Sequence, residues 1–301
     1  MRRRWLWLAV VAACGGGGNA AIDAPPAADA GPDGGMPRQV IGGIDVCEDR
    51  IVTDFGAPME TRRADVSGEL FQDPPVGFHT QTMASGACVL LEFTPAFCDP
   101  FCADGVCIDP GVCQPWPIRV SGGRLDLAGL TEAVSIDPQD GYYYAGVLPD
   151  ELFADDAHVV ATLAGADLPS MTLATEGVVA LETAIPSAGI KLEPGQDHLV
   201  AWTPAGGGRI RLTLNSANQG HGQPYLAIIE CEADDANGQL TIPAALVDGF
   251  PAATPAQICV GHDCPLSRIR RYHRGTAPIG ADRAVELVVA SQVSFFVEHQ
   301  P

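Results

Sequence analysis

The chain has 301 residues and a formal net charge of −20 at pH 7. So acidic a surface repels phosphate backbones, which excludes nucleic acid as a partner. Lys191 is the only lysine, and its surroundings, GIKLEPG, are not a phosphate-binding loop.

The first fourteen residues, MRRRWLWLAVVAAC, have the layout of an export signal. Three arginines precede an apolar run from Trp5 to Ala13, and small residues end the run before Cys14. The run is shorter than the roughly 20 residues that a membrane-spanning helix needs. A plain secretory signal is one interpretation of this pattern.

The tetrad Val11-Ala12-Ala13-Cys14 resembles the lipobox of bacterial lipoproteins. The resemblance implies that residues 1–13 are a signal peptide that is removed, and that Cys14 carries acyl chains as a membrane anchor. Two or more acyl chains hold a protein stably on a membrane. Gly15 follows the cysteine in place of the aspartate that retains some lipoproteins at the inner membrane, so the resemblance favours the outer membrane.

Residues 14–38 are expected to form a tether between the anchor and a folded body at 39–301. After Cys14 the segment consists almost entirely of Gly, Ala, Pro and Asp. Such a composition buries too little apolar surface to offset the entropy of ordering, so we expect disorder. A coil of this length spans roughly 27 Å.

The body is predicted to consist of short strands. Most candidate segments are apolar or alternating and end near Gly, Pro or Asp. A turn at PAGGG is expected to join two of them, 197–203 and 209–214, in a long hairpin. The full set is 64–72, 78–82, 87–93, 117–121, 124–128, 133–137, 141–147, 157–163, 170–175, 178–183, 197–203, 209–214, 225–231, 238–242 and 285–297.

This pattern predicts an all-β fold, an antiparallel β-sandwich with little helix. One short helix is expected after Pro243, over AALVDGF, because proline is favoured in the first helical turn.

Four cysteines, Cys98, Cys102, Cys107 and Cys113, form a dense cluster. Their spacings lack the two-residue knuckle of zinc sites, and disulfides persist in exported proteins, so two local disulfides are predicted. A metal site and reactive thiols are the alternatives. Sequence leaves three connectivities open. A resemblance to small knotted modules of the epidermal-growth-factor type implies alternating pairs, in a stapled insertion at about 88–116.

Five further cysteines, an odd number, remain: Cys47, Cys88, Cys231, Cys259 and Cys264. Cys259 and Cys264 flank the loop VGHD and are candidates for a disulfide, or for a metal site with the histidine between them. One cysteine is expected to be buried and unpaired or to pair outside the chain.

Paired carboxylates are the best candidates for chemistry. Glu230 and Glu232 flank Cys231 on a predicted strand, so they project from one face roughly 7 Å apart. Glycoside hydrolysis uses two carboxyl groups at about 5 to 9.5 Å. With Asp234 and Asp235 they form an acidic run that is a weak candidate for calcium. A solvated acidic turn is the simpler interpretation.

The segment SRIRRYHRG is predicted to be a strand that concentrates four arginines: Arg268, Arg270, Arg271 and Arg274. We expect them to pair with acidic neighbours or to protect a sheet edge from aggregation. A docking patch for an acidic polymer, such as an envelope polysaccharide, is the functional alternative.

No catalytic motif is recognisable. The GxSxG elbow and the HExxH zinc motif are both absent from the sequence. The overall pattern resembles bacterial surface lipoproteins to which no activity is assigned. The expectation is therefore a non-enzymatic envelope lipoprotein, without a cofactor, that binds a protein or glycan or has a structural role. The alternative is an extracellular glycan hydrolase that uses carboxylates near Glu230.

Overall fold

The computed structural model describes residues 38–54, 57–75, 77–94, 96–146, 148–205, 207–216, 225–253 and 266–300. The predicted signal peptide, Cys14, nearly all of the tether, Cys259 and Cys264 lie outside these ranges. Within them, no helix combines the length and apolar composition needed to cross a membrane.

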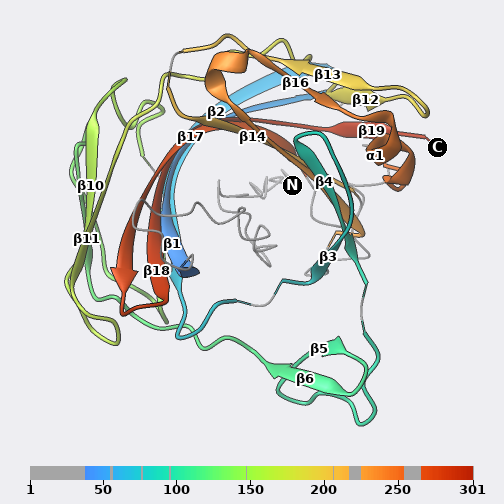
Figure 1. The fold of residues 1–301 in the computed structure, drawn as a ribbon. Coiled ribbons are helices and arrows are strands. Elements are labelled where there is room, and N and C mark those ends of the chain that lie inside the picture. Colours follow the sequence, from blue (N-terminus) through green and yellow to red (C-terminus); the bar gives the residue numbers. More distant parts are fainter. Residues whose placement is uncertain are drawn as a thin grey trace, which may run out of the picture.

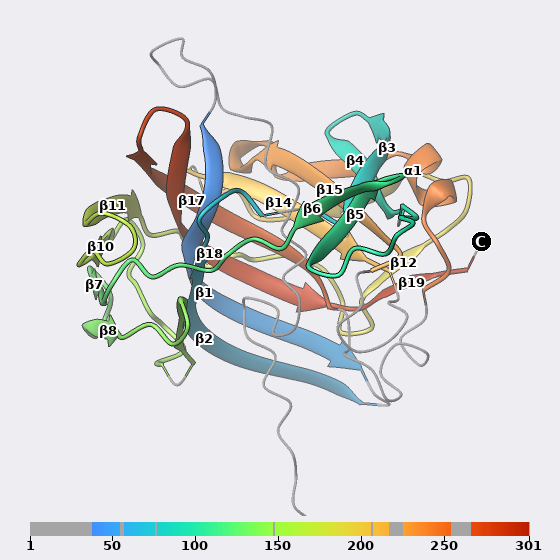
Figure 2. The same cartoon turned by 90° about the horizontal axis from the view of Figure 1, so that it is seen from below.

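A nine-stranded sheet dominates the fold and curves strongly, as Figure 1 shows. Its long central strands, β17, β18, β1 and β2, are seen along their length in Figure 2. In spatial order the strands are β3 (His79–Ser85), β4 (Cys88–Phe93), β15 (Ala227–Asp234), β14 (Arg209–Asn215), β17 (Ser267–Ile279), β18 (Arg283–Phe295), β1 (Gln39–Asp54), β2 (Pro58–Leu70) and β9 (Tyr142–Ala145).

Smaller sheets cover the convex face of this large sheet (Figure 1). One has the order β11 (Met171–Glu176), β10 (His158–Leu163), β7 (Leu125–Ala128) and β8 (Val134–Ile136). Two strand pairs cover the other half: β12 (Ile190–Leu192) with β19 (Val297–His299), and β13 (His198–Ala201) with β16 (Gln239–Ile242). The helix α1 (Ala244–Gly249) follows β16 with Pro243 as its N-cap, as the sequence predicts.

The two large hydrophobic clusters each lie between the large sheet and one group of covering strands, and a small third cluster of Cys47, Tyr272 and Ala290 lies on the concave side. Ile210, Leu212 and Phe295 belong to the cluster next to β12, β13 and β16. Val285 and Leu287 belong to the cluster next to β7, β8 and β10. Residues of one parity along each strand of the large sheet therefore face a core, and residues of the other parity face the concave side.

Close backbone approach requires glycine at two points. Gly42 has φ of 136° beside a bulge in β1, and an added Cβ would collide with the carbonyl oxygen of Glu69. A Cβ on Gly275 in β17 would collide with the carbonyl oxygen of Ala174 in β11. These glycines allow the large sheet to bend and let the covering sheet approach it.

The all-β prediction is confirmed, with two corrections. The large sheet is mixed, because β1 and β18 pair in parallel, as do β12 and β19. The predicted hairpin of 197–203 with 209–214 is wrong: β13 pairs with β16, whereas β14 pairs with β15 and β17. Alternation shows that a segment is a strand but not which strand it pairs with.

A disulfide-stapled hairpin of β5 (Gly105–Asp109) and β6 (Val112–Pro115) projects from the body (Figure 1). Cys98 bonds Cys107 and Cys102 bonds Cys113, so the alternating connectivity is confirmed. The segment is smaller than predicted, because Cys88–Phe93 is strand β4 of the large sheet.

Candidate functional site

The concave side of the large sheet carries a broad band of polar side chains from β15 to β2. Strand register and alternation place them on one face, opposite the core residues. We call this set the concave polar face. Its members are Glu230, Glu232, Asp234, Arg209, Arg211, Thr213, Arg268, Arg270, Tyr272, Arg274, Thr276, Glu286, Gln292, Ser294, Asp45, Asp49, Thr53, Arg63, Asp65, Ser67 and Glu69.

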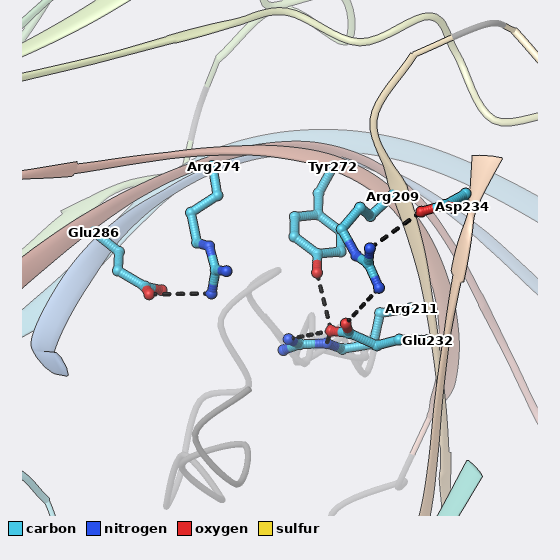
Figure 3. Close-up of polar contacts among 7 residues, drawn as sticks. All are labelled: Arg209, Arg211, Glu232, Asp234, Tyr272, Arg274 and Glu286. Atoms are coloured by element: carbon cyan, nitrogen blue, oxygen red, sulfur yellow. Dashed lines mark hydrogen bonds and ion pairs between the residues drawn. The ribbon is translucent and has the colours of Figure 1, made fainter. Parts of the chain in front are cut away.

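Glu232 is the centre of the network shown in Figure 3. Its Oε1 accepts hydrogen bonds from Arg211 Nη2 at 2.6 Å, Arg211 Nε at 2.8 Å and the Tyr272 hydroxyl at 2.9 Å. Its Oε2 accepts from Arg209 Nη2 at 3.2 Å, and Arg209 Nη1 also reaches Asp234 at 3.1 Å. The Arg211 guanidinium carbon lies 5.4 Å from the centre of the Tyr272 ring. Three neighbouring strands thus hold one carboxylate in a fixed position.

This network changes the acidity of its members. Burial raises the pKa of the Glu232 carboxyl group, but the charge and hydrogen bonds of Arg211, with help from Tyr272 and Arg209, outweigh burial and hold the pKa below its ordinary value. Burial raises the pKa of the Tyr272 hydroxyl, and nearby Glu232 also raises it. Glu232 is therefore ionised and Tyr272 is a neutral hydrogen-bond donor at neutral pH.

The rest of the concave polar face also pairs its charges across strands. Arg270 Nη2 in β17 contacts both carboxylate oxygens of Asp45 in β1, at 2.8 and 2.9 Å. Arg274 Nη1 lies 3.3 Å from Glu286 Oε1, as Figure 3 shows. Arg270 and Arg274 therefore each have a carboxylate partner on a nearby strand.

Asp49 forms a separate, buried group with its neighbours. The Ser294 hydroxyl donates to Asp49 Oδ1 at 2.9 Å, and Arg63 Nη2 donates to Oδ2 at 3.2 Å. Burial nevertheless raises the pKa of the Asp49 carboxyl group, because it outweighs the charge of Arg63.

Among the described residues, Thr213 Oγ1, Gln292 Oε1 and Arg63 Nε are buried on this face and have no hydrogen-bond partner. Thr213 and Gln292 are only 2% and 3% exposed. Buried polar groups are normally hydrogen-bonded, so unfilled ones point to a missing ligand or solvent molecule.

The predicted arginine group is divided between the two faces. Arg268, Arg270 and Arg274 lie on the concave polar face. The Arg271 side chain lies on the opposite, core-facing side of the sheet, where it forms an ion pair with Asp235. Their strand, β17, lies between β14 and β18. The prediction that these arginines protect a sheet edge is therefore wrong, and the predicted pairing with acidic neighbours is confirmed for Arg270, Arg271 and Arg274.

The four acidic residues between positions 230 and 235 are also divided between the two faces of the sheet. Glu230, Glu232 and Asp234 share the concave face, as predicted for the first two. Asp235, in the 3-10 helix η1 (Asp235–Asn237), is buried against Arg271. The four weak calcium candidates therefore do not converge on one point.

For the cysteines that the structure describes, it also decides between disulfides, a metal site and reactive thiols. The sulfur atoms of Cys98, Cys102 and Cys107 lie within 4.8 Å of one another, but each belongs to a disulfide and offers no thiolate for a metal. A third disulfide, Cys88–Cys231, joins the neighbouring strands β4 and β15. Cys47 is buried and belongs to none of these three bridges.

Sequence reasoning missed strand β1 and so missed Asp45 and Asp49. The signal was present, because Ile44, Val46 and Val52 alternate with polar residues in the segment. Glu286 was also missed, since it lies among apolar residues of β18 and its partner Arg274 belongs to another strand.

Replacing Glu232 by Gln tests the network. We expect the free energy of unfolding at pH 7 to fall by about 1–3 kcal/mol, because hydrogen bonds to a charged group are lost. A lowered carboxyl pKa stabilises the fold above the unfolded value, near 4.5, and this contribution is lost as the pH falls through the folded pKa. Urea unfolding of both proteins at several pH values should show the difference shrinking below pH 4.5. A difference independent of pH contradicts the assignment.

No protein-family model matches the chain, and no curated protein matches it in sequence. What defines the protein is therefore its own architecture: an all-β fold with a strongly curved mixed sheet and a charge-paired polar concave face.

Proposed function

We propose that the protein is an exported, lipid-anchored envelope lipoprotein whose concave polar face binds a neutral glycan without cleaving it. The observation that carries the binding role is the concave polar face itself. The apolar face of the large sheet is already used by two cores, so the opposite polar face is not needed for packing. Its buried, unfilled Thr213 Oγ1 and Gln292 Oε1 support a role in holding a polar molecule.

Charge pairing favours a neutral glycan over an acidic polymer. Arg211, Arg270 and Arg274 each face a carboxylate, so they do not form an uncompensated basic patch. Donors and acceptors instead lie side by side, which suits sugar hydroxyl groups because each hydroxyl both donates and accepts. At the β9 edge, Tyr142 and Tyr144 stack with ring centres 6.2 Å apart, and half-exposed Tyr144 offers an aromatic surface.

Export and anchoring are supported by the N-terminal sequence that ends at Cys14 and by the disulfides. Six cysteines in the described residues are bonded in three disulfides, and such bonds persist in oxidising compartments. Intact mass spectrometry of the native chain tests this part of the proposal: a mature protein that begins at an acylated Cys14 supports it. An unprocessed chain with reduced cysteines contradicts it.

Glycan binding is tested with the full chain in detergent and an array of neutral and acidic oligosaccharides. We expect neutral oligosaccharides to bind, and Arg211→Met to weaken binding at least tenfold, because a fixed charged donor and the position of Glu232 are both lost. Lys191→Met is the matched control, since Lys191 pairs with Glu193 on the outer surface and both are exposed. Equal affinity for the wild type and Arg211→Met contradicts the proposed face.

Glycan hydrolysis by Glu230 and Glu232 is the alternative. An ionised Glu232 suits a base or nucleophile, whereas hydrolysis also needs a carboxylic acid that donates a proton. Recovery of intact oligosaccharide after incubation supports binding alone. Cleavage that Glu230→Gln and Glu232→Gln abolish establishes the hydrolase instead.

A further inference from the structure

The disulfide-stapled segment 97–118, which projects from the body, exposes a group of large apolar side chains (Figure 1). Phe97 and Phe101 are 80% and 86% exposed, more than any other large apolar side chain that the structure describes. Single exposed apolar residues are ordinary, but a concentration of them in one short segment marks an interaction surface. We call this group the apolar set. Its members are Phe97, Phe101, Ile108, Val112, Trp116 and Ile118.

The two disulfides of the segment hold most of the apolar set in one rigid unit. The sulfur atoms of Cys98, Cys102 and Cys107 lie within 4.8 Å of one another, and Cys107 is opposite Cys113 in the hairpin. The bridges therefore fix the backbone beside four members of the set. Each of the four cysteines has one such member as its direct neighbour in the chain: Phe97–Cys98, Phe101–Cys102, Cys107–Ile108 and Val112–Cys113.

These apolar side chains are not needed to fold the segment. A unit this small cannot bury a hydrophobic core of its own, and disulfides commonly take the place of one. Within 97–118 the buried residues are Cys98 and Cys102, whereas the members of the apolar set all point to solvent. Because the bridges supply the stability, the apolar side chains are free to contact another surface.

The charges of the segment limit what that surface can be. Asp99, Asp104 and Asp109 are exposed, and the segment contains no lysine, arginine or histidine. A second copy of the chain, docked through the same segment, would bring like charges together, and an anionic lipid surface would be repelled for the same reason. A zwitterionic lipid surface carries no net charge, so it can receive the apolar side chains while the carboxylates stay among hydrated headgroups.

The proposed lipid anchor brings such a surface within reach of the hairpin. Cys14 and Arg38, where the described residues begin, are 24 positions apart, and a coil of that length spans roughly 27 Å. The body would therefore stay close to the membrane that holds the anchor. Tryptophan and phenylalanine are favoured at the boundary between headgroups and acyl chains, which suits Trp116, Phe97 and Phe101.

We propose that the apolar set inserts into the interfacial layer of a zwitterionic phospholipid membrane, as a second attachment beside the anchor at Cys14. Insertion of a rigid hairpin would fix the orientation of the body on the membrane, which a flexible tether alone does not. The inference rests on the proposed envelope location. Insertion itself does not require acylation, so it can be tested on a chain that has no anchor.

Vesicle binding of the mature chain, residues 14–301 with Cys14→Ser, tests the insertion. Trp116 and Trp202 are the only tryptophans of this range, and Trp202 is buried, so Trp116 reports on the hairpin. We expect phosphatidylcholine vesicles to shift the emission of Trp116 to shorter wavelengths, because its ring leaves water. Phosphatidylcholine brominated in its acyl chains should quench the emission. Emission that millimolar phosphatidylcholine leaves unchanged overturns the proposal.

Two matched variants locate the contact. Phe97→Ser with Phe101→Ser changes only exposed side chains, so the fold should persist, and we expect binding to phosphatidylcholine vesicles to weaken about tenfold or more. Leu199→Ser removes an exposed apolar side chain from β13 and is the control that should bind as the wild type does. Equal affinity of the wild type and the phenylalanine variant contradicts the site.

The charge of the lipid provides an independent check. Replacing part of the phosphatidylcholine by phosphatidylglycerol should weaken binding, and added salt should restore it, because salt screens the repulsion of the aspartates. Binding that strengthens with phosphatidylglycerol contradicts the proposal. A dimer that forms without vesicles and that Phe97→Ser with Phe101→Ser dissociates, measured by sedimentation, would make a second copy the occupant and would also overturn it.

These results remain separate from the question of the anchor. Mass spectrometry of the native chain reports the acylation of Cys14 by itself. An acylated native chain whose Cys14→Ser form does not bind vesicles overturns the insertion and leaves the anchor intact. Vesicle binding by the Cys14→Ser form supports the insertion whether or not the native chain is acylated.

Discussion

Replacing Arg271 by Met should lower the free energy of unfolding by about 3–5 kcal/mol, because it leaves the buried Asp235 carboxylate without its counter-charge. Both side chains are only 1% exposed. Arg271 Nε and Nη2 donate to Asp235 Oδ1 at 3.1 and 2.9 Å. Urea unfolding followed by circular dichroism measures the loss.

The position of this pair explains why its loss should be so large. Arg271 also donates to the backbone carbonyl groups of Val179, Ala180 and Thr203, at 3.0, 3.1 and 2.6 Å. It therefore holds two covering segments against the large sheet. Removing it takes the donor away from these carbonyl groups in addition to leaving the carboxylate unpaired.

The matched control is Arg124→Met. Arg124 pairs with Asp126 at 3.0 Å, but both side chains are more than half exposed, so the expected loss is far smaller than for Arg271→Met. The double variant Arg271→Met with Asp235→Leu should recover part of the loss, since no buried charge remains. A loss below about 1 kcal/mol in Arg271→Met contradicts a structural role for the pair.

Removing the disulfide Cys88–Cys231 by changing both residues to Ala should cost about 4–5 kcal/mol of unfolding free energy. The bond joins residues separated by 143 positions, and a long loop restricts the unfolded chain strongly. The disulfide Cys98–Cys107 joins residues only 9 positions apart, so its removal should lower the free energy of unfolding by about 2–3 kcal/mol.

The comparison of the two alanine pairs is the informative measurement. Urea unfolding of each double variant, followed by circular dichroism, should give the larger loss for the bond between β4 and β15. An equal loss in both would show that loop length does not control their contributions. Because the Cys98–Cys107 bond lies in the projecting hairpin, its removal should leave the far-ultraviolet spectrum of the sheet unchanged.

Local sequence patterns were sufficient for several parts of the molecule. The two-residue alternation in RIRLTL placed Ile210, Leu212 and Leu214 on the core face, as the structure shows. Pro243 marked the start of the helix, and the cysteine spacing indicated a stapled segment. These features depend on residues close together in the chain.

The candidate sites could be predicted only in part. Glu230 and Glu232 were placed on one face correctly, because they lie on one strand. Their arginine partners were not predicted: Arg211 lies on β14, and the pairing of β14 with β15 rather than β13 decides the contact. The segment containing Asp45 and Asp49 was not recognised as a strand at all, so their contacts with Arg270 and Ser294 could not be predicted.

Sequence by itself determined the all-β class, the stapled hairpin and the alternation of polar and apolar residues, because each follows from backbone periodicity or short-range spacing. Only the tertiary structure decided which polar residues meet. Arg270 and Asp45 are 225 positions apart, yet they form an ion pair because the parallel pairing of β1 and β18 brings β1 close to β17. Such contacts depend on strand order and register, which the sum of many non-local packing interactions selects and no local pattern encodes.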